Sequence, residues 1–589
     1  MTDAAAPTDL RADRSLGDVA GDAASPAAVS RLSRALAAPP KGAKAARKVV
    51  DTLKASVAAL RQRDYQKGSR LALEALKVDD RSGIAWHVLA ICREKAGDVG
   101  QAITAYESAL KLLPTETAVA HDLGRLAQKL GHFEIAEKLL RKYLEAEPLH
   151  VEATNNLACV LRDQGRYGDA IDTLKAIIAI KPDQALLWNS IGTVLSDQGE
   201  MAQSIIFFDE ALRLDPAFAK ARYNRANARM ALGDPHSAIA DIEQAMAEVE
   251  EPFEIETMRM ALALTRFMVG DMAQGFVDYQ ARLSPHLRDA VRFLSTAPAW
   301  VPGQDLTGQR LLVFGEQGLG DEVLFANALP DLIEAVGPAG RVVIAVEHRL
   351  VPLFQRSFPT ADVVRHATVR QEGRLTRAAD LAEIGEVDLW APIGSLFGHV
   401  RRSPEDFPDR PAFLTPDPDR ISHWRTVLDS LGPQPKVGVL WKSLKLDGSR
   451  RRYFSPFDLW RPVLETPGVT FVNLQYGDCT DELEQARAAG LNLWSPPGID
   501  LKDDLEDVAA LCCALDLVVG PANATSNLAA ASGATWWAIT TPDAWTRFGT
   551  DRYPCYPGTR AFPIEGFGEW GPVMDRLAMA LAEWRDARD

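Results

Sequence analysis

The sequence predicts an α superhelix of repeated helix pairs, followed by two α/β domains with parallel sheets. Three observations predict this fold class. Prolines and glycines recur every 34 residues through the first half of the chain. From about residue 285, β-type runs alternate with helical runs, which is the pattern of parallel sheets. A glycine-rich turn at 315–320 joins the first strong β-type run to a helical run.

The composition narrows the class of protein. The chain has 589 residues, 47% hydrophobic and 25% charged, and a net charge of −15, so we expect two to four domains and neither a nucleic-acid nor a membrane partner. The N-terminus lacks the features of a secretory signal, and no apolar run approaches the ~18 residues of a membrane span. Six cysteines show no C-x-x-C spacing, and no metal motif is present. These features predict a cytoplasmic protein without a metal or prosthetic group.

Residues 1–46 are rich in Ala, Pro, Asp and Ser, a composition that cannot bury a core. We predict a flexible N-terminal arm with a short helix at 27–36.

The repeat array shows the strongest periodicity in the chain. Each glycine is expected in the turn between two helices, each small residue where the two helices approach, and each proline just after the second helix. Five glycines in one register are very improbable by chance. The repeated positions are Gly97, Gly131, Gly165, Gly199 and Gly233; Ala102, Ala136, Ala170, Ser204 and Ala238; and Pro114, Pro148, Pro182 and Pro216.

This pattern resembles the tetratricopeptide repeat family. The positions that carry the resemblance are Trp86, Leu89, Ala90, Ala102, Tyr106, Ala109 and Pro114. We place the domain at 47–284, with repeats at 83–116, 117–150, 151–184, 185–218 and 219–252, a degenerate leading pair at 49–82 and a trailing pair at 253–284. Such arrays bind extended or helical polypeptides on a concave face, so we expect a protein partner there.

Asparagines on the expected inner face of the first helices are candidates for binding that partner. An asparagine side chain can both donate to and accept from a backbone amide. The alternative is a solvated polar helix face without a binding role. The candidates are Asn155, Asn156, Asn189, Asn224 and Asn227.

The second half divides into two predicted domains, 285–431 and 432–589. Each contains its own set of strands and is expected to form a parallel sheet, and the two would face each other across a cleft. A terminal helix at 571–584 is expected to pack back across the pair. The predicted strands are 310–314, 341–346, 361–364 and 387–391 in the first domain, and 436–441, 470–474, 491–493, 515–519 and 535–539 in the second, with a helix at 419–431 between the sets.

The glycine-rich turn carries the candidate catalytic residues. Gly318 and Gly320 allow the backbone to approach a ligand closely, and Asp321 follows them at the start of a helix. Asp321 is the candidate general base, with Glu316 and Glu322 in reserve; the alternative for Asp321 is a helix cap.

Three stretches of the second half, with the turn itself, resemble the heptosyltransferase-like glycosyltransferases of GT-B fold. Gly320-Asp321 matches their first loop, and residues 437–443, 471–478 and 516–529 match the donor-binding domain. The resemblance implies a catalytic base at Asp321 and a nucleotide-sugar donor held by phosphate contacts. The chain departs from the family at Ala522, Asn523 and Asn527, where Asp, Thr and His are usual, so the donor need not be a common nucleoside-diphosphate sugar. The implied donor-binding residues are Gly318, Gly320, Lys442, Ser443, Gln475, Tyr476, Gly520, Asn523, Thr525, Ser526 and Asn527.

Other residues near the expected donor site have two interpretations. Lys442 and Arg450–Arg452 form a basic cluster that is either a phosphate clamp or a solvated loop. Trp536 and Trp537 are expected in the core, whereas Trp545 and Arg547 are expected to border the cleft.

Repeats joined to a GT-B domain resemble the bacterial flagellin glycosyltransferases and, more distantly, the protein O-GlcNAc transferases. The resemblance implies that the repeats capture flagellin and that the catalytic half adds a nonulosonic acid, such as pseudaminic acid, from its CMP-activated form. Two alternatives are a non-catalytic adaptor or export chaperone with a degenerate α/β half, and a glycosyltransferase acting on small molecules or polysaccharides.

Overall fold

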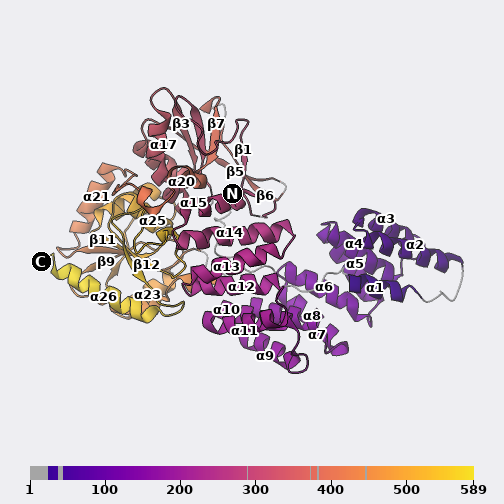
Figure 1. The fold of residues 1–589 in the computed structure, drawn as a ribbon. Helices are drawn as coiled ribbons and strands as arrows, with labels where there is room; N and C mark the ends of the chain where they lie inside the picture. The colour runs from indigo at the N-terminus through magenta and orange to yellow at the C-terminus, as the bar shows by residue number, and fades with distance from the viewer. Residues whose placement is uncertain are drawn as a thin grey trace. The chain divides into compact units, whose positions relative to one another are not determined.

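The computed structural model describes residues 24, 26–37, 44–287, 289–316, 318–371, 373–380, 384–444 and 448–588. The chain divides into two compact units (Figure 1). Of the described residues, the first unit contains those from 24 to 198 and from 206 to 216, and the second contains those from 199 to 205 and from 217 to 588. Among the described residues, none of the helices combines the length and apolarity that a bilayer crossing requires.

The predicted short helix near the N-terminus is present as α1 (Pro26–Ala35). Its apolar residues Val29 and Leu32, with Leu36 just after it, are buried against the start of the repeat array. Helix α2 begins at Lys44, inside the predicted arm. Most of the remaining arm lies outside the described residues.

Seven helix pairs follow, in the predicted register. Each pair is one repeat, and successive pairs pack through their apolar faces within α2–α10 and within α12–α15. The pairs are α2 (Lys44–Arg61) with α3 (Tyr65–Leu76), α4 (Gly83–Lys95) with α5 (Val99–Leu112), α6 (Thr117–Lys129) with α7 (Phe133–Ala146), α8 (Val151–Asp163) with α9 (Tyr167–Ile178), α10 (Ala185–Gln198) with α11 (Met201–Leu214), α12 (Ala219–Ala231) with α13 (Pro235–Ala247), and α14 (Pro252–Met268) with α15 (Met272–Tyr279).

The repeated glycines occupy the turns for a conformational reason. All five, from Gly97 to Gly233, have φ between 75° and 98°, a left-handed conformation that residues with a Cβ rarely adopt. The five predicted turns are therefore confirmed.

Neighbouring first helices also share a polar contact that spans 35 residues. His87 Nε2 lies 2.8 Å from Asp122 Oδ2, Ser190 donates to Asn155 Oδ1, and Thr265 donates to Met230 Sδ at 2.9 Å. A residue in one repeat thus bonds the residue one position further on in the next. These directional contacts fix the register of the stacked helices.

The second unit contains two fully parallel sheets. The first has the order β4-β3-β2-β7, and the second has the order β10-β9-β8-β11-β12-β13. Numbered within each sheet, these orders are 3-2-1-4 and 3-2-1-4-5-6, the doubly wound arrangement whose ligands bind where the strand order reverses. The strands are β2 (Arg310–Phe314), β3 (Arg341–Val346), β4 (Asp362–Arg365), β7 (Leu389–Pro392), β8 (Lys436–Val439), β9 (Thr470–Asn473), β10 (Leu493–Trp494), β11 (Leu517–Pro521), β12 (Trp536–Thr540) and β13 (Arg560–Pro563).

Helices cover both sheets and share one hydrophobic core with the last repeats. The terminal helix α26 (Trp570–Asp586) packs through Val573 and Leu577 on the second sheet alone, rather than across both lobes (Figure 1). The helices of this half are α16 (Leu319–Phe325), α17 (Leu329–Val336), α18 (Val351–Ser357), α20 (Leu396–Val400), α21 (Pro418–Asp429), α22 (Arg461–Leu464), α23 (Thr480–Ala488), α24 (Leu505–Ala514) and α25 (Ala524–Ala531).

Sequence reasoning missed a small third sheet of order β1-β6-β5. Its strands are β1 (Arg292–Leu294), β5 (Ala367–Gln371) and β6 (Arg374–Ala378), of which β5 is exposed along its whole length. Such strands lack both the apolar run and the alternation that reveal a buried strand.

Candidate functional site

The glycine-rich turn lies where the order of the first sheet reverses, because it follows β2, between β3 and β7. Asp321 Oδ2 accepts a 3.1 Å hydrogen bond from the Gly318 N–H, so the carboxylate caps α16. The capping alternative is thus realised in the structure. Asp321 is half-buried, and its capping bond holds the carboxylate against the turn. Gln317 lies outside the described residues.

Glu316 is fully buried in an ion pair. Arg282, at the end of the repeat domain, donates to both carboxylate oxygens at 2.7 and 3.1 Å, and the Gly394 N–H donates at 2.6 Å. Neither side chain has measurable solvent exposure. A carboxylate held in this way cannot reach a substrate hydroxyl, so the contacts favour a structural role for Glu316.

Glu322 is also buried and paired. His366 Nε2 lies 3.1 Å from its carboxylate, Arg377 lies at 3.2 Å, and the Glu347 N–H donates at 2.9 Å. Burial would raise the pKa of Glu322, but the His366 hydrogen bond and the Arg377 charge outweigh burial and hold the pKa below its ordinary value. A Cβ on Gly315 would lie 2.5 Å from the Glu322 carboxyl carbon. The contacts of Glu322 therefore hold the glycine-rich turn in place.

In the second sheet, Lys442 and Ser443 follow β8, and Gln475 and Tyr476 follow β9. Gln475 joins the two loops. Its Oε1 accepts from the Trp441 and Lys442 N–H groups at 2.9 Å, and its Nε2 donates to the Lys442 and Tyr476 carbonyls. With all these bonds made inside the protein, Gln475 holds the loops rather than a ligand.

Lys442 and Ser443 remain closer to solvent. The Lys442 ammonium pairs with Glu482, and the side chains of both are about one-fifth exposed. The Ser443 hydroxyl lies 3.4 Å from the Tyr476 hydroxyl, whose pKa is raised by burial. A phosphate could compete with Glu482 for the ammonium, because the pair is only partly desolvated.

The loop after β11 begins helix α25. Asn523 caps this helix, accepting from the Ser526 N–H at 3.2 Å, while the Asn523 N–H donates to Ser526 Oγ at 2.8 Å. Ser526 is fully buried and also bonds the Pro521 carbonyl, so its role is to shape the loop. The Asn523 side-chain nitrogen is buried and has no hydrogen-bond partner among the described residues. That N–H group is the donor of this loop best suited to an added ligand.

Gly520 allows close packing of strand β11 against the chain that follows β8. A Cβ there would lie 2.5 Å from the Leu440 carbonyl oxygen, so a side chain would separate β11 from β8. Thr525, at the start of α25, is largely buried.

The two predicted loops meet between the lobes. Asn527 Nδ2, on α25, donates to the Gly320 carbonyl at 3.2 Å, and α16 packs against α25. The loop that contains Gly320 and the helix that carries Asn527 are therefore in direct contact.

Further residues gather at the carboxyl ends of the second sheet. Asp543, three residues after the end of β12 at Thr540, accepts from the Thr541 hydroxyl at 2.7 Å and from the Tyr453 hydroxyl at 3.0 Å. Arg452 lies over the Phe567 ring. Sequence reasoning missed Tyr453 and Asp543, although an acid shortly after a parallel strand is a recognisable pattern. Arg450 is 9% exposed, and the Arg451 side chain lies outside the described residues.

Of the three tryptophan predictions, two are confirmed and one is wrong. Trp536 and Trp537 are buried, as predicted. Trp545 was expected to border a cleft, but it is 7% exposed and its ring lies 5.5 Å from that of Phe267 in α14. It packs the second lobe onto the last repeat. Arg547, in the same short helix, is half-buried.

The five asparagines of the repeats lie on first helices α8, α10 and α12. Asn155, Asn156, Asn189 and Asn224 are buried, and Asn227 is partly exposed. Asn155 contributes to the packing of adjacent repeats through Ser190.

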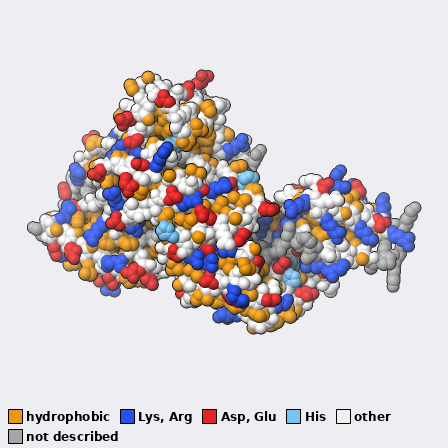
Figure 2. All heavy atoms as spheres, viewed as in Figure 1, with side chains coloured by type: hydrophobic (Ala, Val, Ile, Leu, Met, Phe, Trp, Pro, Cys, Tyr) orange, Lys and Arg blue, Asp and Glu red, His pale blue; other side chains and the backbone are white. Residues whose placement is uncertain are grey.

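The described part of the chain contains no group of three or more His, Cys, Asp or Glu side chains that could hold a metal ion. On the face shown in Figure 2, acidic and basic side chains are interspersed, without one large basic field.

Comparison with known proteins supports the repeat assignment and defines the family. The tetratricopeptide repeat model matches residues 53–117, 121–185, 155–219 and 189–250. Protein FlbA of Caulobacter vibrioides is 50% identical over 574 residues, covering 97% of this chain and 95% of FlbA. The chain belongs to the FlbA family. The match to FlbA includes the α/β half as well as the repeats.

Solved structures resemble part of the FlbA-family chain. A tetratricopeptide repeat protein from Parabacteroides merdae is 17% identical, covers 40% of this chain and 91% of that chain, and has a TM-score of 0.35. PilW, a widely conserved type IV pilus biogenesis factor, is 20% identical, covers 36% of this chain and 97% of that chain, and has a TM-score of 0.32.

Proposed function

We propose that this chain is a protein O-glycosyltransferase of GT-B type. Its repeats would hold flagellin, and its α/β half would transfer a nonulosonic acid, such as pseudaminic acid, from a CMP-activated donor to a serine or threonine hydroxyl. The observation that carries the proposal is the pair of doubly wound sheets whose switch-point loops meet through Asn527 and Gly320.

In the proposed reaction, the acceptor hydroxyl oxygen attacks the anomeric carbon of the sugar. The bond from that carbon to the phosphate oxygen breaks, CMP leaves with the electron pair, and Asp321 takes the hydroxyl proton. Asp321 suits this role because it stands in the turn that faces α25 of the other lobe.

The donor phosphate would be held by the second lobe. Lys442, Ser443 and Asn523 are the side chains we assign to it, together with the N–H groups at the start of α25. Lys442 must then exchange its partner Glu482 for phosphate. Gly520, Gln475 and Ser526 would act indirectly, by holding the sheet and the loops in place.

Two observations support flagellin as the partner. The tetratricopeptide array is a protein-binding architecture. The name of the relative FlbA points to a flagellar role for this family. Of the five repeat asparagines we assign only Asn227, which is partly exposed, to the partner-binding face, because Asn155, Asn156, Asn189 and Asn224 are buried.

One observation favours a second function, that of a non-catalytic flagellar adaptor. Glu316, Gln475 and Ser526 are satisfied by bonds inside the protein, and Lys442 already has a carboxylate partner. An α/β half whose polar groups are already paired inside the protein would act as a scaffold for binding a client protein, without catalysis.

Co-expression with flagellin and a nonulosonate pathway separates the two functions. The wild-type chain should add the mass of the sugar to flagellin, as measured by intact mass spectrometry. Asp321→Ala should abolish that addition while flagellin still co-purifies, and Asp409→Ala, an exposed acid elsewhere on the lobe, should leave it unchanged. Flagellin that binds the wild-type chain but gains no mass would establish the adaptor instead.

A further inference from the structure

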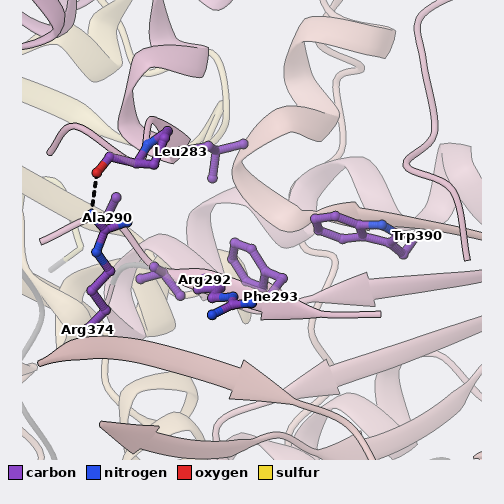
Figure 3. A pocket seen from close by; sticks show the side chains of 8 residues that line it. Leu283, Ala290, Arg292, Phe293, Arg374 and Trp390 are labelled. Carbon is purple, nitrogen blue, oxygen red and sulfur yellow. Dashed lines mark hydrogen bonds between the residues drawn. The ribbon is translucent and has the colours of Figure 1, made fainter. Parts of the chain in front are cut away.

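The small sheet β1-β6-β5 borders a cavity of about 500 Å³. The cavity lies where the repeat domain ends and the first lobe begins, and most of its lining is apolar (Figure 3). Its aromatic wall consists of Phe293 and Trp390, whose ring centroids are 5.6 Å apart. The lining residues are Leu283, Pro285, Ala290, Val291, Arg292, Phe293, Arg374 and Trp390.

The small sheet is rich in arginine, and two of its arginines, Arg292 and Arg374, line the cavity. The three strands carry Arg292, Arg370, Arg374 and Arg377 and no acidic residue, although the whole chain has a net charge of −15. Arg292, Arg370 and Arg374 are exposed. Among the described residues, none of these three forms an ion pair; Arg374 donates instead to the Pro285 carbonyl at 2.5 Å. The guanidinium groups are therefore available to an added carboxylate.

The small sheet also exposes apolar side chains on both of its edge strands. Leu294 is 42% exposed and Val369 is 53% exposed. Both β1 and β5 are edge strands, each paired with β6 alone. Edge strands offer unpaired backbone groups to an additional strand. Arginines, aromatic rings and a free edge are the elements with which proteins bind extended polypeptides.

We propose that this surface, formed by Arg292 and Arg374 at the cavity and by Leu294 on the edge strand β1, binds an extended acidic segment of a partner polypeptide. The segment would lie along the free edge of β1, place an apolar side chain against Phe293 and Trp390, and direct carboxylates to Arg292 and Arg374. A concave apolar cavity with only a few surrounding cations favours a polypeptide over a membrane or a nucleic acid, which would need a broad basic surface. Binding of such a segment does not require transferase activity.

Fluorescence anisotropy of the full chain tests the proposal. The probe is a fluorescein-labelled peptide of twelve residues that alternates aspartate with leucine and threonine. We expect Arg292→Glu/Arg374→Glu to weaken its binding at least fivefold, because two attractive charge pairs become repulsive. Arg487→Glu, an exposed arginine on α23, should leave binding unchanged. Equal affinity for wild type and the double variant, or binding of anionic vesicles in preference to the peptide, would overturn the proposal.

A second measurement leaves the arginines intact. Leu294→Cys introduces an exposed thiol, whereas five of the six native cysteines are buried and Cys513 is half-buried. An environment-sensitive dye on this thiol should change its emission as the peptide saturates the protein. The same dye on a cysteine at Met579, an exposed position on α26, should not respond. An unchanged emission at Leu294→Cys would place the peptide elsewhere and refute the proposal.

Discussion

Breaking the buried ion pair between Arg282 and Glu316 should destabilise the second unit strongly. Arg282→Met keeps most of the side-chain volume but leaves the Glu316 carboxylate buried, with the Gly394 N–H, 2.6 Å away, as its remaining donor among the described residues. Arg282 also bonds Ser395 and the Tyr279 carbonyl and lies 4.4 Å from the Tyr279 ring centre, so its removal affects three elements at once.

The expected magnitude follows from burial. Removing one partner of a fully buried pair costs about 3 to 5 kcal/mol, because the other charge stays desolvated. A cooperative unit that spans residues 217–589 has an unfolding entropy of roughly 0.8 kcal/mol/K, so the Tm should fall by about 4 to 6 °C. Arg282→Met/Glu316→Leu should cost less than the single change, because it leaves no buried charge.

Thermal unfolding of the full chain, followed by calorimetry, provides the assay. The transition of the α/β unit should move, whereas the repeat unit of residues 17–198 should keep its own transition. Arg487→Met, a change at an exposed arginine, is the matched control. A single variant whose Tm falls by less than 1 °C, or no further than that of the double variant, would refute the reasoning.

Two further predictions concern the lobes. Gly320→Ala would place a methyl group 3.2 Å from Asn527 Nδ2 and 3.4 Å from the Ala524 Cα, so it should cost about 1 to 3 kcal/mol in urea unfolding, and Asn527→Ala should recover part of that loss. Additive losses would show that the two residues are not in contact. Burial lowers the pKa of His399, stacked on Trp300, to about 4, so its contribution to stability is present above pH 6.5 and is lost as the pH falls toward 4. Over that range we expect a loss of about 1 to 2 kcal/mol after allowance for its partial exposure, and His399→Phe should remove this component of the urea midpoint's pH dependence.

Periodic features were predictable because they depend on local rules. The 34-residue step predicted the helix pairs, since a left-handed glycine, a close helix contact and a terminating proline each act within a few residues. Strands β2 and β3 were predicted at their observed bounds because they are continuous apolar runs that parallel sheets bury. Strands β5 and β6 were missed because their stability depends on partners rather than on their own pattern.

The candidate site was predictable only in outline. The sequence placed Gly320 and Asn527 at the ends of two sheets, and the structure joins them by a hydrogen bond. The sequence did not distinguish a carboxylate that is available for chemistry from one that is held in a salt bridge. Glu316 and Asp321 are only five residues apart in the sequence. Glu316 is buried in an ion pair with Arg282, which lies 34 residues earlier, whereas Asp321 caps a helix.

The sequence by itself determined the repeat register, the parallel sheets and the turn that precedes Asp321, because each is encoded by neighbouring residues. Only the tertiary structure decided which polar groups are already satisfied, because their partners come from distant segments: Arg282 for Glu316, His366 and Arg377 for Glu322, and Glu482 for Lys442. Burial and pairing arise from packing, which no local pattern specifies.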